Sequence, residues 1–397
     1  MSNRSQTGWL ASRFPIAASF RRQYLDFAMP RNLNYLWNFG AFLTIALVFL
    51  VVSGIFLAIN YTPTITSAFS SVEKIDRAIA SGWFIRSLHI GGVSMLFAAL
   101  YIHIARSLYY GSYKAPRELV WITGLCLLIL VMLAAFAGYI LPWGQMSFWG
   151  ATVVINALKA LPLVGTPLSN WLLGDSSLGD VALHRFFILH FVTAFAIIGI
   201  VTLHVATLHV VGPNNPAGIE PRRPEATLPF HPYYTTKDGL GLCLFLMIYA
   251  GLIFFLPDIL TLASNYVEAN PLVTPRDIMP EWYFSPFYAI LRAVPSKLGG
   301  LLLASGSVLL LFFTPWLDRS PIRSARHRPR MRWALRGAFL AFILLGLAGS
   351  RPLTEGWLWI SRAATIYWYA YFLLVLPLLP RIENPNAMSS IQDTHCL

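Results

Sequence analysis

Four of the nine histidines in the chain form two pairs with the same spacing. His89 and His103 are fourteen residues apart, as are His190 and His204. Fourteen steps of about 100° end about 40° short of four full helical turns, so each pair lies on one side of its helix. The rise along each pair is about 21 Å, most of the thickness of a bilayer's hydrocarbon core. Imidazoles placed in this way at two depths suit two haem irons with both axial positions filled.

The order of the expected membrane spans predicts which imidazoles face each other. One span separates the two helices that carry the histidines, so these helices run parallel. His89 is therefore expected opposite His190 near the outer face, and His103 opposite His204 near the inner face. Four unrelated histidines that form hydrogen bonds inside a bundle are the alternative, but the repeated spacing argues against it.

Four glycines repeat the same fourteen-residue spacing on two other helices. They are Gly40 and Gly54 on one helix and Gly124 and Gly138 on another. A flat macrocycle against a helix needs a position without a side chain, which glycine provides. Glycine also serves close packing in membrane helices, so each pair alone is a weak signal. The shared period on four helices predicts two stacked haem sites.

Three arginines lie near the ends of these expected sites. Arg86 and Arg185 belong to the outer end and Arg106 to the inner end. Each guanidinium could pair with a haem propionate, or could reach the membrane interface as ordinary charged residues do. The chain has no Cys-x-x-Cys-His motif, so the haem would be bound without covalent attachment.

Two haems with filled axial positions predict electron transfer rather than oxygen chemistry. A transmembrane electron carrier needs a membrane-soluble redox partner, and quinone has that chemistry. A secondary transporter is the alternative from another class, but its polar groups would lie near the span centres rather than in two layers.

The composition independently indicates a membrane protein. Hydrophobic residues make up 56% of the 397 residues and charged residues only 12%. A soluble domain is about a quarter charged, so soluble, disordered and collagen-like proteins are excluded. Long apolar runs rather than short alternating segments exclude an outer-membrane barrel.

The apolar runs predict an all-α membrane protein with eight transmembrane helices, the first four of which form a di-haem bundle. The expected spans are 38–60, 83–105, 119–141, 184–211, 238–256, 298–317, 334–350 and 357–379. Between them, 142–183 and 257–297 are long connections. The amphipathic stretches 153–161 and 282–291 are expected to form short interfacial helices there.

The distribution of basic residues predicts the orientation. Of the 29 lysines and arginines, 19 lie in the termini and in the connections on the same side as them. The positive-inside rule therefore places both termini in the cytoplasm. The arginine cluster between Arg323 and Arg336 contributes most to this predicted orientation. Its alternative interpretation is a binding site for anionic lipid. The net charge of +12 needs no nucleic acid as partner.

Three segments resemble one known family. They are Gly138-Tyr-Ile-Leu-Pro-Trp-Gly-Gln-Met-Ser-Phe-Trp-Gly-Ala-Thr152, Pro280-Glu281-Trp282-Tyr283 and Asn214-Asn215-Pro216. Together with the histidine and glycine spacings, they make the chain resemble the cytochrome b subunit of the cytochrome bc complex, from about residue 30 to 385. The basic N-terminus without an evident targeting segment favours a bacterial member in the inner membrane. A haem-containing anchor of a quinone dehydrogenase is a nearer alternative, but it would lack the Glu281 loop.

The resemblance implies a division into two units and a set of partners. Residues 1–215 would form the di-haem bundle with quinone sites, and 216–397 the C-terminal helices with the Glu281 loop. It implies two non-covalently bound haem b groups and oxidation of quinol at the outer face. The partners would be a Rieske-type iron–sulfur protein and a cytochrome c-type subunit, within a homodimer of the complex.

The resemblance also implies residues for the outer quinol site, with Glu281 as proton acceptor. A carboxylate in an apolar loop has its proton affinity raised by desolvation, which suits this role. The expected lining is Tyr139, Tyr288, Met132, Phe136 and Gly150.

The inner quinone site is expected around His209 and Asp238, which could hand two protons to a reduced quinone. Lys237 lies beside them and supplies charge. Asp238 could also cap the fifth span at its N-terminus.

The chain departs from the family pattern at three places. Pro213 stands where a small polar residue is usual, 261–264 lacks the usual acidic stretch, and Asp277 replaces a histidine. These departures put loop details in doubt but leave the expected reaction intact.

Overall fold

The computed structural model describes residues 13–175, 177–220, 224–257 and 261–383, together with residues 9 and 259. Within them, eight helical segments are long and apolar enough to cross a membrane, which confirms the predicted all-α membrane protein. Their helices are α3 (Phe39–Asn60), α5 (Gly82–Tyr110), α6 (Glu118–Ile140), α9 (Asp180–Val211), α10 (Thr235–Phe255), α12 (Lys297–Leu317), α13 (Pro329–Gly349) and the pair α14 (Glu355–Ala370) and α15 (Leu376–Ile382). The chain ends, whose side of the membrane the sequence predicts, lie outside the described ranges.

The spanning helices end at residues that break helices. α5 is followed by Gly111 and α9 by Gly212, with φ angles of +65° and +71°, which glycine adopts without steric strain. Pro63 and Pro142 follow α3 and α6 closely. α9 begins at Asp180, four residues earlier than predicted, because an acidic first turn favours a helix N-terminus before the apolar run begins.

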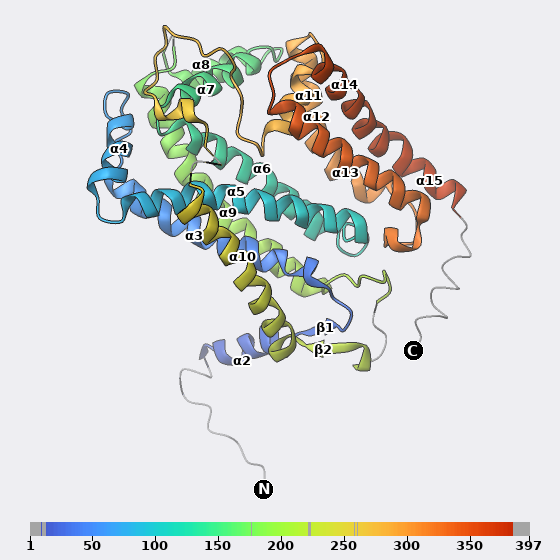
Figure 1. Ribbon diagram of the computed structural model, residues 1–397. Helices are drawn as coiled ribbons and strands as arrows, with labels where there is room; N and C mark the ends of the chain where they lie inside the picture. The colour runs from blue at the N-terminus through green and yellow to red at the C-terminus, as the bar shows by residue number, and fades with distance from the viewer. Residues whose placement is uncertain are drawn as a thin grey trace.

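The first four spanning helices pack as two pairs, α3 against α5 and α6 against α9. In Figure 1, α12, α13 and α14 form a separate group beside them. A core cluster that includes Phe97, Leu128, Leu335 and Phe372 joins the two groups. The helices that carry the histidines are therefore packed against the C-terminal half of the chain.

The long connections form helices at one end of the bundle. They are α4 (Ala68–Ala78), α7 (Gln145–Leu158), α8 (Gly165–Leu173) and α11 (Ser285–Arg292). Figure 1 shows α4, α7 and α8 at the end opposite α2 (Ile16–Phe20). The short helices were predicted, but their bounds were wrong: the first begins at 145 instead of 153, and the second at 285 instead of 282. Pro286 in the first turn of α11 fixes its start, because proline is tolerated only there.

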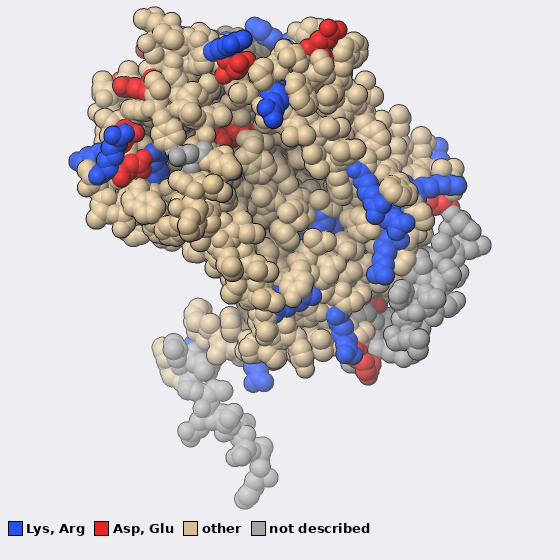
Figure 2. Space-filling view, in the orientation of Figure 1, with Lys and Arg blue, Asp and Glu red and all other residues tan. Residues whose placement is uncertain are grey.

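The opposite end is held by a small sheet and a buried charge cluster. β1 (Ala28–Pro30) pairs antiparallel with β2 (Thr227–Pro229), so the N-terminal segment is tied to the linker before α10. Asp318 and Arg328 form a buried ion pair of 2.8 Å, and Lys114 lies 2.8 Å from the same carboxylate. In Figure 2, charged side chains are sparse over the middle of the face shown, as a membrane-spanning surface requires.

Candidate functional site

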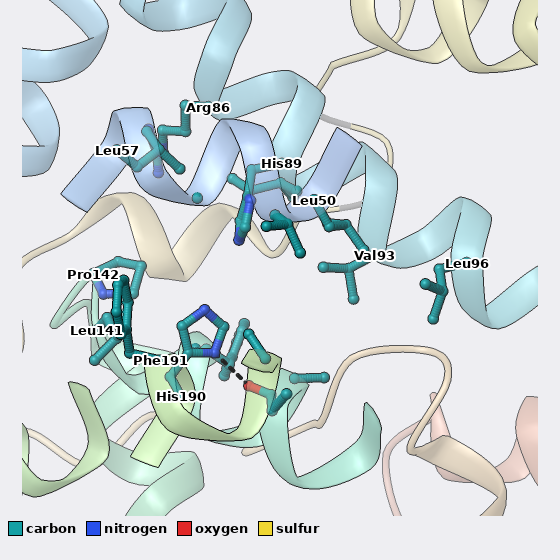
Figure 3. Close-up of a pocket in the computed structure, with 18 of the residues that line it drawn as sticks. Leu50, Leu57, Arg86, His89, Val93, Leu96, Leu141, Pro142, His190 and Phe191 are labelled. Carbon is teal, nitrogen blue, oxygen red and sulfur yellow. Dashed lines mark hydrogen bonds between the residues drawn. The ribbon is translucent and has the colours of Figure 1, made fainter. Parts of the chain in front are cut away.

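His89 of α5 and His190 of α9 face each other across a cavity. Their ring centroids are 6.1 Å apart and the ring planes make an angle of 75°. Figure 3 shows the two imidazoles pointing toward one another from opposite walls, with Leu50, Val93 and Pro142 around them. The cavity, here called the His89 cavity, has a volume of about 260 Å³ and is lined by α3, α5, α6 and α9. Imidazole nitrogens are common metal ligands, so these two residues would be the ones to hold a metal ion placed between the walls.

Hydrogen bonds orient these two imidazoles. His89 Nδ1 lies 2.9 Å from Ser53 Oγ on α3, and His190 Nδ1 lies 2.8 Å from the carbonyl oxygen of Ala134 on α6. A carbonyl can only accept, so Nδ1 of His190 carries the proton and Nε2 keeps its lone pair. Partners of this kind fix the orientation of histidines that bind metals.

His103 and His204 line a second cavity, here called the His103 cavity, with a volume of about 390 Å³. Thr123 Oγ1 lies 3.0 Å from His204 Nδ1, matching the Ser53 contact of the other pair. His103 differs, because its Nδ1 lies 3.2 Å from the guanidinium of Arg106. The structure thus brings the four histidines together in the two expected pairs.

The four glycines lie directly against the imidazoles. A side chain's Cβ at Gly138 would be 2.6 Å from His190 Cε1, and at Gly54 it would be 3.1 Å from His89 Cε1. At Gly124 the distance to His204 Cε1 would be 3.1 Å, and at Gly40 the distance to His103 Cε1 would be 3.8 Å. Gly54, Gly124 and Gly138 therefore make room for an imidazole of the neighbouring helix, rather than only for a macrocycle as the sequence suggested, whereas Gly40 is at ordinary contact distance.

The three arginines have different surroundings. Arg106 lines the His103 cavity, and its Nε is buried without a hydrogen-bond partner among the described residues. Arg86 lines the His89 cavity and forms an ion pair with Asp76 of α4. Arg185 donates to the carbonyl oxygen of Trp171 and is not part of the cavity wall. A buried guanidinium with an unpaired Nε beside an imidazole pair suits an anionic group such as a haem propionate.

Glu281 and Tyr139 line the His89 cavity next to the imidazole pair. Burial raises the pKa of Glu281 to about 7, and the nearby Tyr139 hydroxyl opposes this rise. That hydroxyl makes no hydrogen bond of regular geometry within the described residues. A carboxyl with this pKa can take up or release a proton at neutral pH.

The other residues expected at the outer site do not line this cavity. The Tyr288 hydroxyl donates to the carbonyl oxygen of Ile278, 2.9 Å away. Met132 packs against one core cluster and Phe136 against another. Gly150 has open space where a Cβ would lie, within the part of the chain that the structure describes.

His209 and Asp238 both line the His103 cavity, at the end near β1. The rings of His209 and Phe27 are 4.6 Å apart, and Nδ1 of His209 is buried without a partner among the described residues. Lys237 instead donates to the carbonyl oxygen of Leu33 and does not line the cavity. Asp238 is not an N-cap, because α10 already begins at Thr235.

Sequence reasoning missed the two hydroxyl residues that hold imidazoles. Ser53 directly precedes Gly54, and Thr123 directly precedes Gly124. A hydroxyl before a glycine of the fourteen-residue pattern was the available signal. It also missed Asn265, whose side-chain oxygen accepts from the backbone N–H of Ser147 at 2.9 Å and ties the 261–273 loop to α7.

Two of the three departures from the family pattern lie at the cavities, whereas Asp277 lines neither of them. Thr261 and Leu262 contribute to the wall of the His89 cavity, and Pro213 to the wall of the His103 cavity.

Comparison with known proteins finds the same architecture. Residues 24–212 match the family described as cytochrome b/b6/petB, and residues 268–369 match cytochrome b(C-terminal)/b6/petD. Cytochrome b of Rickettsia prowazekii (strain Madrid E) is 51% identical over 383 residues, which cover 96% of each chain. A chain of a hyperthermophilic respiratory complex III superposes with a TM-score of 0.89 at 32% identity, covering 94% of this chain and 98% of that one.

One further relative is longer than this chain. Cytochrome b/c1 of Bradyrhizobium diazoefficiens is 46% identical over 378 residues, which cover 95% of this chain and 55% of that protein. These matches exclude the transporter alternative. With eight spanning helices, paired imidazoles and this likeness along nearly its whole length, the chain belongs to the cytochrome b family and forms the catalytic core subunit of a ubiquinol–cytochrome c reductase.

Proposed function

We propose that the chain binds two haem b groups, one between His89 and His190 and one between His103 and His204. The observation that carries the proposal is the 6.1 Å separation of the His89 and His190 rings, whose Nδ1 atoms both have partners. When bound, the two groups supply one-electron transfer across the bilayer. The chain's part is to orient the imidazoles and to exclude water. Arg106, buried beside His103, and Arg86 would be the guanidinium groups that pair with the propionates.

Quinol oxidation takes place beside Glu281 in the His89 cavity. In its carboxylate form Glu281 accepts a proton from a quinol hydroxyl, and its pKa of about 7 matches that task at neutral pH. Tyr139 lies next to the carboxyl and lines the same cavity. The mainly apolar wall suits the ring of a quinol.

Quinone reduction takes place at the far end of the His103 cavity. His209 and Asp238 both reach this cavity and can each deliver a proton to a reduced quinone. Phe27 packs against the His209 ring and fixes its position. Lys237 contributes positive charge from outside the wall, because its amino group is engaged by Leu33.

The proposal extends to the partners and the location of the chain. The chain works with a Rieske-type iron–sulfur protein and a cytochrome c-type subunit, in a homodimer in the bacterial inner membrane. The longer relative named cytochrome b/c1 supports the second partner. The distribution of basic residues supports a cytoplasmic location for the His103 cavity and for both termini. We keep 1–215 and 216–397 as the two units; the two family matches fall on either side of this boundary.

Haem content of single histidine variants tests the proposal. His103→Ala in membranes that contain the assembled complex should remove the inner haem from the reduced-minus-oxidised spectrum and leave the outer one. His89→Ala should do the reverse. His184→Ala, an exposed histidine of α9, is the matched control and should keep both. Loss of the outer haem alone on His103→Ala would contradict the pairing.

A further inference from the structure

Helix α5 presents two different faces to the rest of the molecule. His89 and His103 lie on one face. Ser94, Phe97 and Tyr101 are three and four residues apart and form a stripe on another face. At about 100° per residue, the centres of the two stripes are about 130° apart around the helix. From this second face Ser94 and Phe97 also reach the wall of the His89 cavity, whereas Tyr101 lines neither cavity.

Each residue of this stripe contacts the loop that follows α10. The Tyr101 hydroxyl donates to the carbonyl oxygen of Tyr283 at 2.5 Å. The indole Nε1 of Trp282 donates to Ser94 Oγ at 3.1 Å. The rings of Phe97 and Tyr283 are stacked, with centroids 4.2 Å apart and an interplanar angle of 2°. Two hydrogen bonds and one ring stack thus fix two consecutive residues of the loop.

These two residues directly follow Glu281. On its other side the loop is held by the Tyr288 hydroxyl, which donates to the carbonyl oxygen of Ile278. The carboxyl of Glu281 lies between these two anchors and reaches the His89 cavity. A buried carbonyl that loses its donor is unfavourable, so the loop has little freedom to move while Tyr101 is present.

We propose that Tyr101 is a positioning residue for Glu281, assisted by Ser94 and Phe97, so that the helix which presents His89 and His103 also sets the place of the proton-accepting carboxyl. This rests on the proposed role of Glu281 in quinol oxidation. Tyr101 lines neither cavity and therefore does not touch quinol in this proposal; it acts through the backbone of the loop. Ser94 lines the His89 cavity and holds the indole of Trp282.

The groups that face Glu281 come from several elements. Tyr139 of α6 and Tyr283 of the loop itself are the nearest titratable neighbours. Across the cavity lie His89, His190 and Arg86, the last paired with Asp76 of α4. Of these groups, only Tyr283 is in direct contact with Tyr101. Burial is the main cause of the raised pKa of Glu281, so a looser, wetter loop should lower that pKa.

The test is Tyr101→Phe in membranes that contain the assembled complex. We expect kcat/KM for quinol to fall roughly five- to tenfold because the loop loses one anchor. The acid limb of its pH profile should also move to lower pH, because Glu281 becomes more hydrated. Both haems should remain in the spectrum. Ser94→Ala is the second variant and should shift the limb in the same direction.

Tyr369→Phe is the matched control. Its hydroxyl also donates to a backbone carbonyl at 2.5 Å, that of Leu303, but it joins α14 to α12 and lines neither cavity. The substitution Tyr369→Phe removes a tyrosine hydroxyl, as Tyr101→Phe does. It should leave the acid limb of the pH profile of kcat/KM unchanged.

Two outcomes separate this inference from the proposed function. The positioning role of Tyr101 is wrong if Glu281→Gln abolishes the acid limb of the pH profile, but Tyr101→Phe and Ser94→Ala lower the rate and leave the acid limb at the same pH. If the limb persists in Glu281→Gln, another group accepts the proton, and the proposed role of Glu281 fails.

Discussion

Ser53 on α3 and His89 on α5 are joined by a hydrogen bond of 2.9 Å between Oγ and Nδ1. The same hydroxyl lies 2.6 Å from the carbonyl oxygen of Phe49, to which it donates. Its lone pair therefore accepts from Nδ1–H of His89, which leaves Nε2 free for a metal. The pair α3 and α5 thus contributes more than packing, because one helix fixes the tautomer of an imidazole on the other.

Replacing Ser53 with alanine should weaken binding of the outer haem and spare the inner one. Loss of a partner that orients a metal-binding histidine lowers metal affinity roughly 10- to 100-fold. The measurement is the loss of the outer haem's absorbance during detergent washing of the complex. Thr202→Val on α9 is the control, because among the described residues its hydroxyl bonds to the carbonyl oxygen of Ile198 in its own helix and to no imidazole. Equal loss of the outer haem in both variants would contradict the role of Ser53 in holding His89.

Alanine at the four glycines should have graded effects. Gly138→Ala should be the most disruptive, since the new Cβ would lie 2.6 Å from His190 Cε1, and Gly40→Ala the mildest at 3.8 Å from His103. Overpacking of this kind destabilises by about 1–3 kcal/mol. Haem content per complex and its thermal midpoint are the measurements. Gly251→Ala on α10, with nothing within 4 Å of its Cβ position in the described part of the chain, should match the parent protein.

The eight spans and the two histidine pairs could be predicted because each depends on local spacing and apolarity alone. Contacts between distant segments could not. Tyr101 and Tyr283 are 182 residues apart in the chain, and no local pattern pairs them. The β1–β2 sheet was missed for the same reason, since each strand has only three residues. Tyr288 was assigned from resemblance, whereas its hydroxyl is directed to Ile278 by the local turn into α11.

Asp318→Asn should destabilise the complex by about 3–5 kcal/mol, because Lys114 and Arg328 would lose their shared buried counter-charge. Burial alone would raise the pKa of Asp318, but the two cations outweigh it and hold the pKa below 3.8. The stabilisation is therefore present above pH 3.8 and is lost as the pH falls through the lower folded-state pKa. Thermal unfolding at pH 7 and in acid should show the difference between variant and parent shrinking in acid.

Asp26→Asn serves as the control for this effect. Asp26 also pairs with an arginine, Arg21, but its side chain is 59% exposed. Exposed pairs contribute little, so its variant should unfold like the parent protein. A similar loss of stability in both variants would mean that the buried ion pairs of Asp318 stabilise the protein no more than an exposed pair does.

The last prediction separates the two quinone sites. Glu281→Gln should slow haem reduction by quinol, whereas Asp238→Asn should leave reduction normal and slow reoxidation of the inner haem. The reason is position: Glu281 lines the His89 cavity and Asp238 lines the His103 cavity. An amide keeps the size of each side chain but takes up no proton at neutral pH. Each step should therefore lose roughly 10²- to 10⁴-fold in rate if no water substitutes.

Flash-induced haem reduction as a function of pH is the measurement. Because burial raises the pKa of Glu281 to about 7, the parent protein should oxidise quinol more slowly as the pH falls below 7, where Glu281 becomes protonated. The Glu281 variant should lose this dependence, and the Asp238 variant should keep it. Glu268→Gln, an exposed carboxyl in the preceding loop, should behave like the parent protein. The same defect in the Glu281 and Asp238 variants would mean that the two residues serve one site, since residues in separate cavities have no reason to affect the same step.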